Sequence, residues 1–172
     1  MEGHTEQIVV GGQISTVFVD KVKQSVNNTF TSICQETPVC TGISENGVHA
    51  STIVGIMSVV CKGMVMCLTL GFPKETALAT AKKFTGTEIA FDTPDMGDVI
   101  GELANILTGD IAAAMEQLGM PGELSIPTVA RGSEIEMLLP TRPPSVTLNF
   151  KSTFGSFWLK VALGSPNIQI KK

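Results

Sequence analysis

The sequence predicts an α+β fold in which a unit of one helix and three strands occurs twice, and the strands of both units form one largely antiparallel sheet packed by helices. Stretches with the period of an amphipathic helix alternate with runs of β-branched and aliphatic residues. Two strand-like runs, residues 63–73 and 155–166, share the plan of a glycine, a strand and then Gly-x-Pro. A spaced polar pattern also occurs in both long helical stretches, on Asp20, Gln24 and Asn27 and on Asp98, Glu102 and Asn105.

The first half of the chain begins with an amphipathic helix. Apolar residues recur at helical spacing from residue 17 to 33, and Pro38 lies beyond them. Three strands are expected between residues 39 and 71, separated by two dipeptides that are typical of tight turns. A short helix then opens near Pro73 and ends at Gly86, because proline favours the first turn of a helix and glycine its end. The turn dipeptides are Asn46-Gly47 and Lys62-Gly63.

The second half begins with a longer helix, from about residue 95 to residue 118. Its first turn is acidic, as the helix dipole favours, and Gly119 follows its end. Strands are then expected over residues 124–131, 145–152 and 156–163. We therefore expect a single domain, residues 1–172, with related halves at about 17–86 and 94–164.

Composition argues against several classes of function. Of the 172 residues, 43% are hydrophobic and 16% are charged, below the roughly 25% charged share of typical soluble domains. This composition predicts a full core and some apolar surface that another subunit covers. The net charge of −4 and the lack of a basic run argue against nucleic-acid binding. No apolar run reaches the roughly 20 residues that span a bilayer. The N-terminus also lacks the basic segment with which a secretory signal peptide begins. We therefore expect a cytoplasmic protein.

The cysteines are expected to be reduced thiols that pack as small hydrophobes. In each of the pairs Cys34/Cys40 and Cys61/Cys67, five residues separate the thiols, a wider spacing than in zinc knuckles, and only His49 could add a nitrogen ligand. The sequence therefore predicts no metal site. Glycine-rich phosphate-binding loops and the Gly-x-Ser-x-Gly motif of hydrolases are absent, and no nucleophile accompanies His49 at a recognised spacing.

Candidate functional residues lie on one side of the longer helix. At about 100° per residue, four positions fall within roughly 60° of one another, and we call them the polar stripe: Asp98, Glu102, Asn105 and Gly109. Apolar residues occupy the opposite side, so the stripe should be exposed. It could be an ordinary solvated face. However, Asn105 is a poor helix former, and Gly109 costs about 1 kcal/mol relative to alanine. A flat surface of carboxylates and a carboxamide beside a bare glycine also suits docking against another macromolecule.

The polar stripe belongs to a longer resemblance. The run Ile100-Gly-Glu102-Leu-Ala-Asn105-Ile-Leu-Thr-Gly109 is followed by Leu124-Ser-Ile-Pro127-Thr-Val-Ala-Arg-Gly132, and an earlier strand ends in Gly71-Phe-Pro-Lys-Glu75. Together these motifs resemble the signature of the CheC/CheX/FliY phosphatases of bacterial chemotaxis: Asp or Ser, three residues, Glu, two residues, Asn, and a Pro some twenty residues on. The resemblance covers most of residues 17–164. Only the second long helix has the full Glu/Asn pair, so the chain most resembles CheX, which has one active site.

This resemblance implies a CheC-like fold, a homodimer, and hydrolysis of the aspartyl phosphate on a phosphorylated CheY-type response regulator. By this resemblance, Glu102 pairs with a lysine of the partner, and Asn105 orients the water that attacks the phosphorus atom. Asp98 and Gly109 are expected to contribute partner-binding surface. Mg²⁺ is expected on the response regulator, and no cofactor is expected on this chain itself.

The chain departs from the family pattern at two positions. Gln24 replaces the acid in the first helix, so a second site built on Asn27 should be weak or dead, since glutamine cannot pair ionically with a lysine. Ile126 stands where family members often have a second proline. The alternative function is a non-catalytic signalling module that binds response regulators through the polar stripe.

Overall fold

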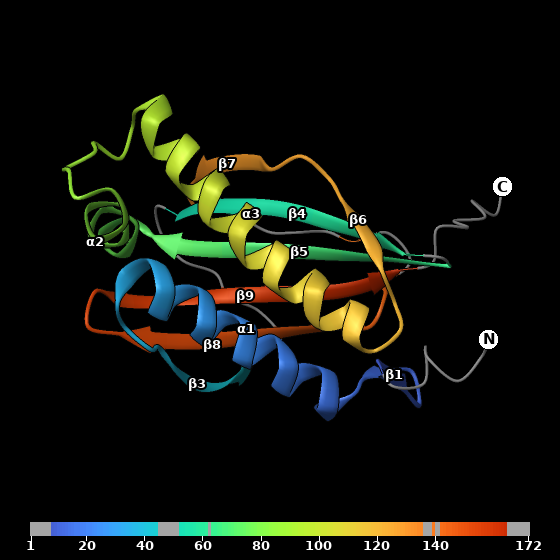
Figure 1. Ribbon diagram of the computed structural model, residues 1–172. Helices are drawn as coiled ribbons and strands as arrows, with labels where there is room; N and C mark the ends of the chain where they lie inside the picture. The colour runs from blue at the N-terminus through green and yellow to red at the C-terminus, as the bar shows by residue number, and fades with distance from the viewer. Residues whose placement is uncertain (1–7, 45–51, 62, 136–138, 140–141, 165–172) are drawn as a thin grey trace, which may run out of the picture.

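One antiparallel sheet organises the molecule. The computed structural model describes residues 8–44, 52–61, 63–135, 139 and 142–164. Within them, seven strands form a sheet in the order β3, β8, β9, β5, β4, β6, and β7 also pairs with β4. Helices α1 and α3 cross one face of this sheet, and α2 lies at one end of it (Figure 1). The α+β fold with an antiparallel sheet packed by helices is confirmed. The division into two related halves stays a prediction.

The helices begin and end where local sequence signals place them. Their bounds are Thr16–Cys34 for α1, Lys74–Thr85 for α2 and Pro94–Gln117 for α3. Ser15 caps α1, because its hydroxyl oxygen accepts a hydrogen bond from the Phe18 backbone N–H at 3.2 Å. Gly86 ends α2 in the left-handed conformation, with a φ angle of 75°. All three predicted helices are therefore present, with ends within two residues of the expected ones.

Most of the predicted strands are also present. The long strands are β3 (Val39–Ser44), β4 (Thr52–Cys61), β5 (Met64–Pro73), β8 (Ser145–Ser152) and β9 (Gly155–Gly164). Gly63 has a φ angle of 84° in the turn between β4 and β5, whereas Lys62 and the predicted Asn46-Gly47 turn lie outside the described residues. A separate two-stranded ribbon, which the sequence did not predict, is formed by β1 (Val9–Val10) and β2 (Gln13–Ile14).

The single strand predicted over residues 124–131 is wrong. Two strands occupy this stretch, β6 (Gly122–Leu124) and β7 (Thr128–Gly132), and both pair with β4. Leu124 is opposite Val59 and Thr128 is opposite Ile56, so residues 125–127 face only two residues of β4. One extra residue in an edge strand is a β-bulge, and it interrupts the ladder there. Proline at position 127 fits this interruption because it has no N–H to donate.

The core lies between the sheet and the helices α1 and α3. From α1, Phe30 stacks on Phe157 of β9 with ring centroids 4.5 Å apart. The side of β5 that faces the helices is fully apolar, and its buried residues are Met64, Met66, Leu68, Leu70 and Phe72. Among the described residues, no helix combines the length and hydrophobicity needed to cross a membrane.

A glycine lets α3 lie directly on the sheet. A Cβ atom added to Gly55 of β4 would lie 2.7 Å from the Cβ of Ala104 and 3.1 Å from the Ile100 carbonyl oxygen. Real Cβ atoms do not approach other carbons this closely, so the backbones of β4 and α3 are in contact at this point. Ala104 is also the residue directly before Asn105. The closeness of this contact therefore fixes the depth and rotation of the helix that carries the polar stripe.

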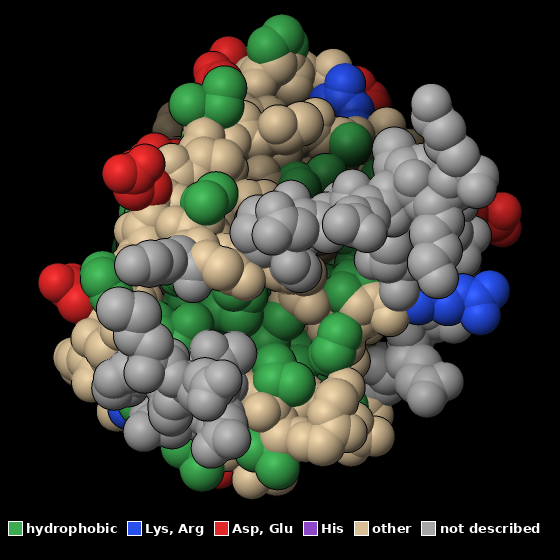
Figure 2. Space-filling view, turned by 90° about the vertical axis from the view of Figure 1, so that its right-hand side faces the viewer, with side chains coloured by type: hydrophobic (Ala, Val, Ile, Leu, Met, Phe, Trp, Pro, Cys, Tyr) green, Lys and Arg blue, Asp and Glu red, His purple; other side chains and the backbone are tan. Residues whose placement is uncertain are grey.

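Part of the surface is apolar, as the low charge content predicts. Exposed large hydrophobic side chains are Val10, Val17, Val39, Ile43, Val60, Leu124 and Ile126. Figure 2 views the molecule from its end, and hydrophobic side chains gather near the middle of that face, whereas Asp and Glu side chains lie toward the margin. The strand β3 forms an outer edge of the described sheet, and it exposes Val39 and Ile43. An apolar edge strand of this kind is a surface that association can cover.

We predict that Gly55→Ala destabilises the protein, because the new methyl group forces α3 away from β4. Overpacking of this kind lowers the free energy of unfolding by about 1–3 kcal/mol. The matched control is Gly97→Ala in α3, where a Cβ atom would meet nothing within 4 Å. This control should raise the free energy of unfolding by about 0.5–1 kcal/mol, because alanine favours the helix. Denaturant unfolding measures both changes, and equal stability of the two variants would contradict the contact.

Candidate functional site

The site is built on α3, whose start is fixed by local chemistry. Thr93 precedes the helix and Pro94 occupies its first turn, where the missing N–H has no cost. The Thr93 hydroxyl donates a hydrogen bond to the Ala90 carbonyl oxygen at 2.7 Å, which closes the preceding turn. At the other end, Gly119 adopts a φ angle of 77° just beyond the helix. Local signals therefore fix both ends of the helix that carries the polar stripe.

The structure brings the four residues of the polar stripe to one side of α3. Asp98 and Glu102 are exposed, and Asn105 and Gly109 are half-buried. The opposite side is buried against the sheet, through residues that include Met96, Val99, Ile100, Leu103, Leu107 and Ile111. Three residues that we expected on the buried side, Ile106, Ala114 and Leu118, are only half-buried. At about 100° per residue, Ile106 lies at the margin of the apolar side, whereas Ala114 and Leu118 lie at the C-terminal end of α3, where Ala114 lines a groove between α1 and α3.

The functional groups of the stripe are available for a partner. Among the described residues, none forms a hydrogen bond or an ion pair with the side chains of Asp98, Glu102 or Asn105. The next acid along the helix differs, because the Asp110 carboxylate accepts a hydrogen bond of 2.5 Å from the Thr29 hydroxyl of α1. Thus Asp110 helps to join the two helices, while the carboxylates of the stripe face outward with their charge uncompensated within the described residues.

Gly109 has no structural reason to be glycine within the described fold. A Cβ atom added there would meet nothing within 4 Å. Gly101 differs, because its added Cβ would lie 3.4 Å from a methyl carbon of Val129 and 3.8 Å from the Pro127 Cβ. Position 101 is therefore where α3 lies against the bulge and β7, whereas the bare surface at Gly109 stays open beside Asn105.

Arg131, which sequence reasoning did not single out, ties β7 to the segment before α3. Its guanidinium donates hydrogen bonds to the carbonyl oxygens of Phe91 at 2.6 Å, Asp92 at 3.2 Å and Thr93 at 3.3 Å. It also lies over the Phe91 ring, 5.7 Å from the centroid. An arginine with three carbonyl partners holds their backbone in one geometry. A lone arginine in a strand gives no periodic signal, so only the structure identifies this role.

The related positions on α1 are arranged differently. Gln24 is exposed and lines a polar groove of about 230 Å³ between α1 and α3, together with Lys21, Asn28, Asp110 and Gln117. The carboxamide oxygen of Asn27 is buried and has no hydrogen-bond partner among the described residues. No carboxylate of α1 stands at position 24 to pair with a cation. The first helix therefore lacks the pairing of acid and amide that α3 presents.

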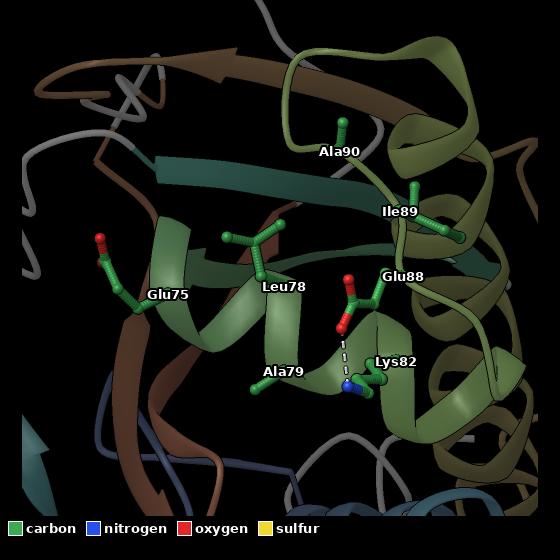
Figure 3. A pocket seen from close by; sticks show the side chains of 7 residues that line it. All are labelled: Glu75, Leu78, Ala79, Lys82, Glu88, Ile89 and Ala90. Atoms are coloured by element: carbon green, nitrogen blue, oxygen red, sulfur yellow. Dashed lines mark hydrogen bonds and ion pairs between the residues drawn. The ribbon is translucent and has the colours of Figure 1, made fainter.

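A separate hollow beside α2 does not include the stripe. It has a volume of about 620 Å³, and Figure 3 shows its lining residues, which are Glu75, Leu78, Ala79, Lys82, Glu88, Ile89 and Ala90. At one end, the Lys82 ammonium lies 2.8 Å from the Glu88 carboxylate. This hydrogen bond from Lys82 lowers the pKa of Glu88, but the pair is exposed and screened by solvent. Apolar side chains therefore line much of the hollow, and its polar side chains do not come together as a catalytic group.

The cysteines do not form a site within the described residues. All four thiols are free in this structure. Burial raises the pKa of the Cys34 thiol to about 11, so this thiol stays protonated and unreactive near neutral pH. In the described part of the chain, no three His, Cys, Asp or Glu side chains come together as metal ligands. His49 lies outside the described residues.

The comparisons with solved structures agree on the fold. A chemotaxis protein CheX from Desulfovibrio desulfuricans superimposes with a TM-score of 0.75 over 86% of this chain and 99% of that one, at 21% sequence identity. A CheC-like superfamily protein from Shewanella superimposes with a TM-score of 0.77 over 88% of this chain and 100% of that one, at 17% identity. CheX in a CheX–CheY–BeF₃–Mg²⁺ complex from Borrelia burgdorferi gives a TM-score of 0.65 over 85% of this chain and 97% of that one, at 12% identity.

The family comparison identifies the chain. No curated protein matches it significantly in sequence. The family model described as "Chemotaxis phosphatase CheX" matches residues 52–151, which is more than half of the chain. The matched region contains α3 with its polar stripe, the bulge and Arg131. On the combined evidence of this match and the fold, the chain belongs to the CheX family of chemotaxis phosphatases.

Proposed function

We propose that this protein hydrolyses the aspartyl phosphate of a phosphorylated CheY-type response regulator. The observation that carries the proposal is the pair Glu102 and Asn105, one turn apart on α3: Glu102 is exposed, Asn105 is half-buried, and neither side chain has a partner among the described residues. The Borrelia structure supports the choice of partner, because it is a complex of CheX with CheY, BeF₃ and Mg²⁺. Receiver domains of this kind act inside the cell, and we accordingly assign the protein to the cytoplasm.

The proposed reaction is an in-line attack of water on phosphorus. A bond forms between the water oxygen and phosphorus, the bond between phosphorus and the aspartyl oxygen breaks, and inorganic phosphate and a free carboxylate result. An acyl phosphate is already activated, and Mg²⁺ on the response regulator would neutralise developing charge. This protein then needs no nucleophile or cofactor of its own. Its task is to bring one water molecule into line, which is catalysis by positioning.

Each residue of the stripe has a distinct proposed role. The Glu102 carboxylate pairs with a lysine of the response regulator and aligns the two proteins. The Asn105 carboxamide holds the water, because it has both a donor and an acceptor and brings no negative charge to an acidic phosphorylation site. Asp98 and the bare surface at Gly109 contribute contact area. The pair Gln24 and Asn27 on α1 lacks the acid, so one active site per chain is expected.

We further propose that the protein is a symmetric homodimer joined at sheet edges or faces. The low charge content and the apolar edge strand β3 support this arrangement, because an open edge with exposed Val39 and Ile43 favours association. Sedimentation at micromolar concentration should give a species of twice the 18.2 kDa chain mass. A single species of the chain mass would contradict the dimer.

The Glu102→Ala variant should weaken binding to the phosphorylated receiver by about 1–3 kcal/mol, because a charge-assisted pair is lost. Glu102→Gln should recover little of this loss, and added salt should reduce the difference from wild type. The matched control is Glu116→Ala on the same helix. At 1.5 Å per residue, Glu116 lies about 21 Å from Glu102, more than two Debye lengths at physiological salt. Unchanged binding of both Glu102 variants across a salt series would show that the acid is only solvated surface.

The Asn105→Ala variant should lose turnover about a hundredfold or more while it keeps receiver binding, since the water is positioned in the transition state. Asn105→Asp should be worse than alanine because it adds negative charge. The free energy of unfolding should change by less than about 0.5 kcal/mol, because the side chain lies on the outer side of α3. Asn28→Ala on α1 is the matched control and should keep wild-type turnover. Near-normal phosphate release by folded Asn105→Ala would favour a non-catalytic binding module.

A further inference from the structure

The bulge between β6 and β7 lies beside the polar stripe. Pro127, at the end of the bulge, lies next to Gly101, because its Cβ is 3.8 Å from the position that a Cβ atom of Gly101 would occupy, and Gly101 lies one turn before Asn105 on α3. Ile126 directly precedes Pro127 in the chain. A partner that docks on Asn105 and extends over this edge of the sheet would therefore come close to the bulge that contains Ile126.

The bulge is anchored on both sides of Ile126. On one side, the Ser125 backbone N–H donates to the Ser58 carbonyl oxygen at 2.9 Å, and the Ser58 backbone N–H donates to the Ser125 hydroxyl at 2.9 Å. The Ser125 hydroxyl also donates to the Ile126 carbonyl oxygen at 3.1 Å. On the other side, the proline ring fixes the backbone and packs against α3. The backbone of Ile126 is therefore held in one position at the surface.

The side chain of Ile126 does not contribute to the protein's own core. It is 84% exposed, the highest value among the exposed large hydrophobic residues of the described chain. Single exposed apolar residues are common on protein surfaces and need no explanation by themselves. Ile126 differs from such residues because it lies in a bulge, contacts on both sides fix its backbone, and the bulge adjoins the helix that carries the proposed docking surface. Bulges often redirect a side chain beside a functional site.

We propose that Ile126 is an apolar anchor for the response regulator, and that it inserts into an apolar depression on the receiver surface beside the phosphorylated aspartate. This inference rests on the proposed function. The stripe offers the partner charge and hydrogen bonds but little apolar area, and Ile126 supplies that area. Because its backbone is already fixed, little conformational freedom is lost on docking. A second copy of the chain seated here would cover the approach to Asn105, so the receiver is the occupant that agrees with catalysis.

An apolar anchor also contributes selectivity. The pairing of Glu102 with a lysine suits any receiver that carries the lysine, whereas an isoleucine distinguishes receivers by the shape of the adjacent surface. A receiver with a charged or bulky side chain at the facing position would leave Ile126 exposed or create a clash. The partner is therefore a receiver domain that combines an acyl phosphate, a lysine and an uncovered apolar depression on one face.

The test compares Ile126→Ser with Val17→Ser, which changes another exposed β-branched residue in the first turn of α1. The probe is the beryllofluoride-loaded form of a CheY-type receiver that the wild-type protein dephosphorylates. Ile126→Ser should weaken binding about tenfold, which corresponds to about 1.4 kcal/mol, and this loss should not depend on salt. Turnover at saturating receiver and the melting temperature should stay at wild-type values. Ile126→Leu should restore most of the binding, and Val17→Ser should bind as wild type does.

The outcomes separate this inference from the proposed function. Wild-type binding by Ile126→Ser, with turnover still lost in Asn105→Ala, would overturn the apolar anchor and leave the phosphatase proposal intact. A changed sedimentation coefficient of Ile126→Ser with unchanged receiver binding would assign the residue to self-association and also overturn the anchor. Failure of the wild-type protein to accelerate phosphate release from any CheY-type receiver would instead overturn the proposed function.

Discussion

The close contact between Gly55 of β4 and Ala104 of α3 is the constraint on which the candidate site depends. With no side chain at position 55, the helix lies on the strand at backbone distance. Because Ala104 faces inward at this point, Asn105 is turned toward the margin of the helix and Glu102 away from the sheet. A helix that packed through large side chains would lie farther from the sheet, and the positions of the proposed acid and amide would change with it.

Two further contacts fix the surroundings of α3. Arg131 holds the backbone of residues 91–93, so the start of the helix is tied to β7. Pro127 lies next to Gly101, which places the bulge beside α3. The proposed functional surface thus consists of one helix and one bulged edge strand, both supported by β4. A surface of this kind suits a reaction in which the partner supplies the phosphorylated group and this protein aligns one water molecule.

Much of this could be predicted from the sequence, because the relevant signals are local. Periodicity, Pro73 and Gly86 predict the helices, and the spacing of Glu102 and Asn105 predicts that they share one side of α3. The bulge was missed because an alternating apolar run reads as one strand until the register against β4 is known. Arg131 and Gly55 were missed for a similar reason. Their partners are distant in the sequence, and a lone arginine or glycine does not reveal what it contacts.

The central claim is that α3 presents a working phosphatase site and not merely an adhesive surface. The most direct measurement is the rate of phosphate release from a phosphorylated CheY-type receiver with Mg²⁺, with and without the wild-type protein at catalytic concentration. We predict that release is faster with the protein and that each chain turns over many receiver molecules. Release at the receiver's own rate, or slower release because the bound protein shields the acyl phosphate, would contradict it.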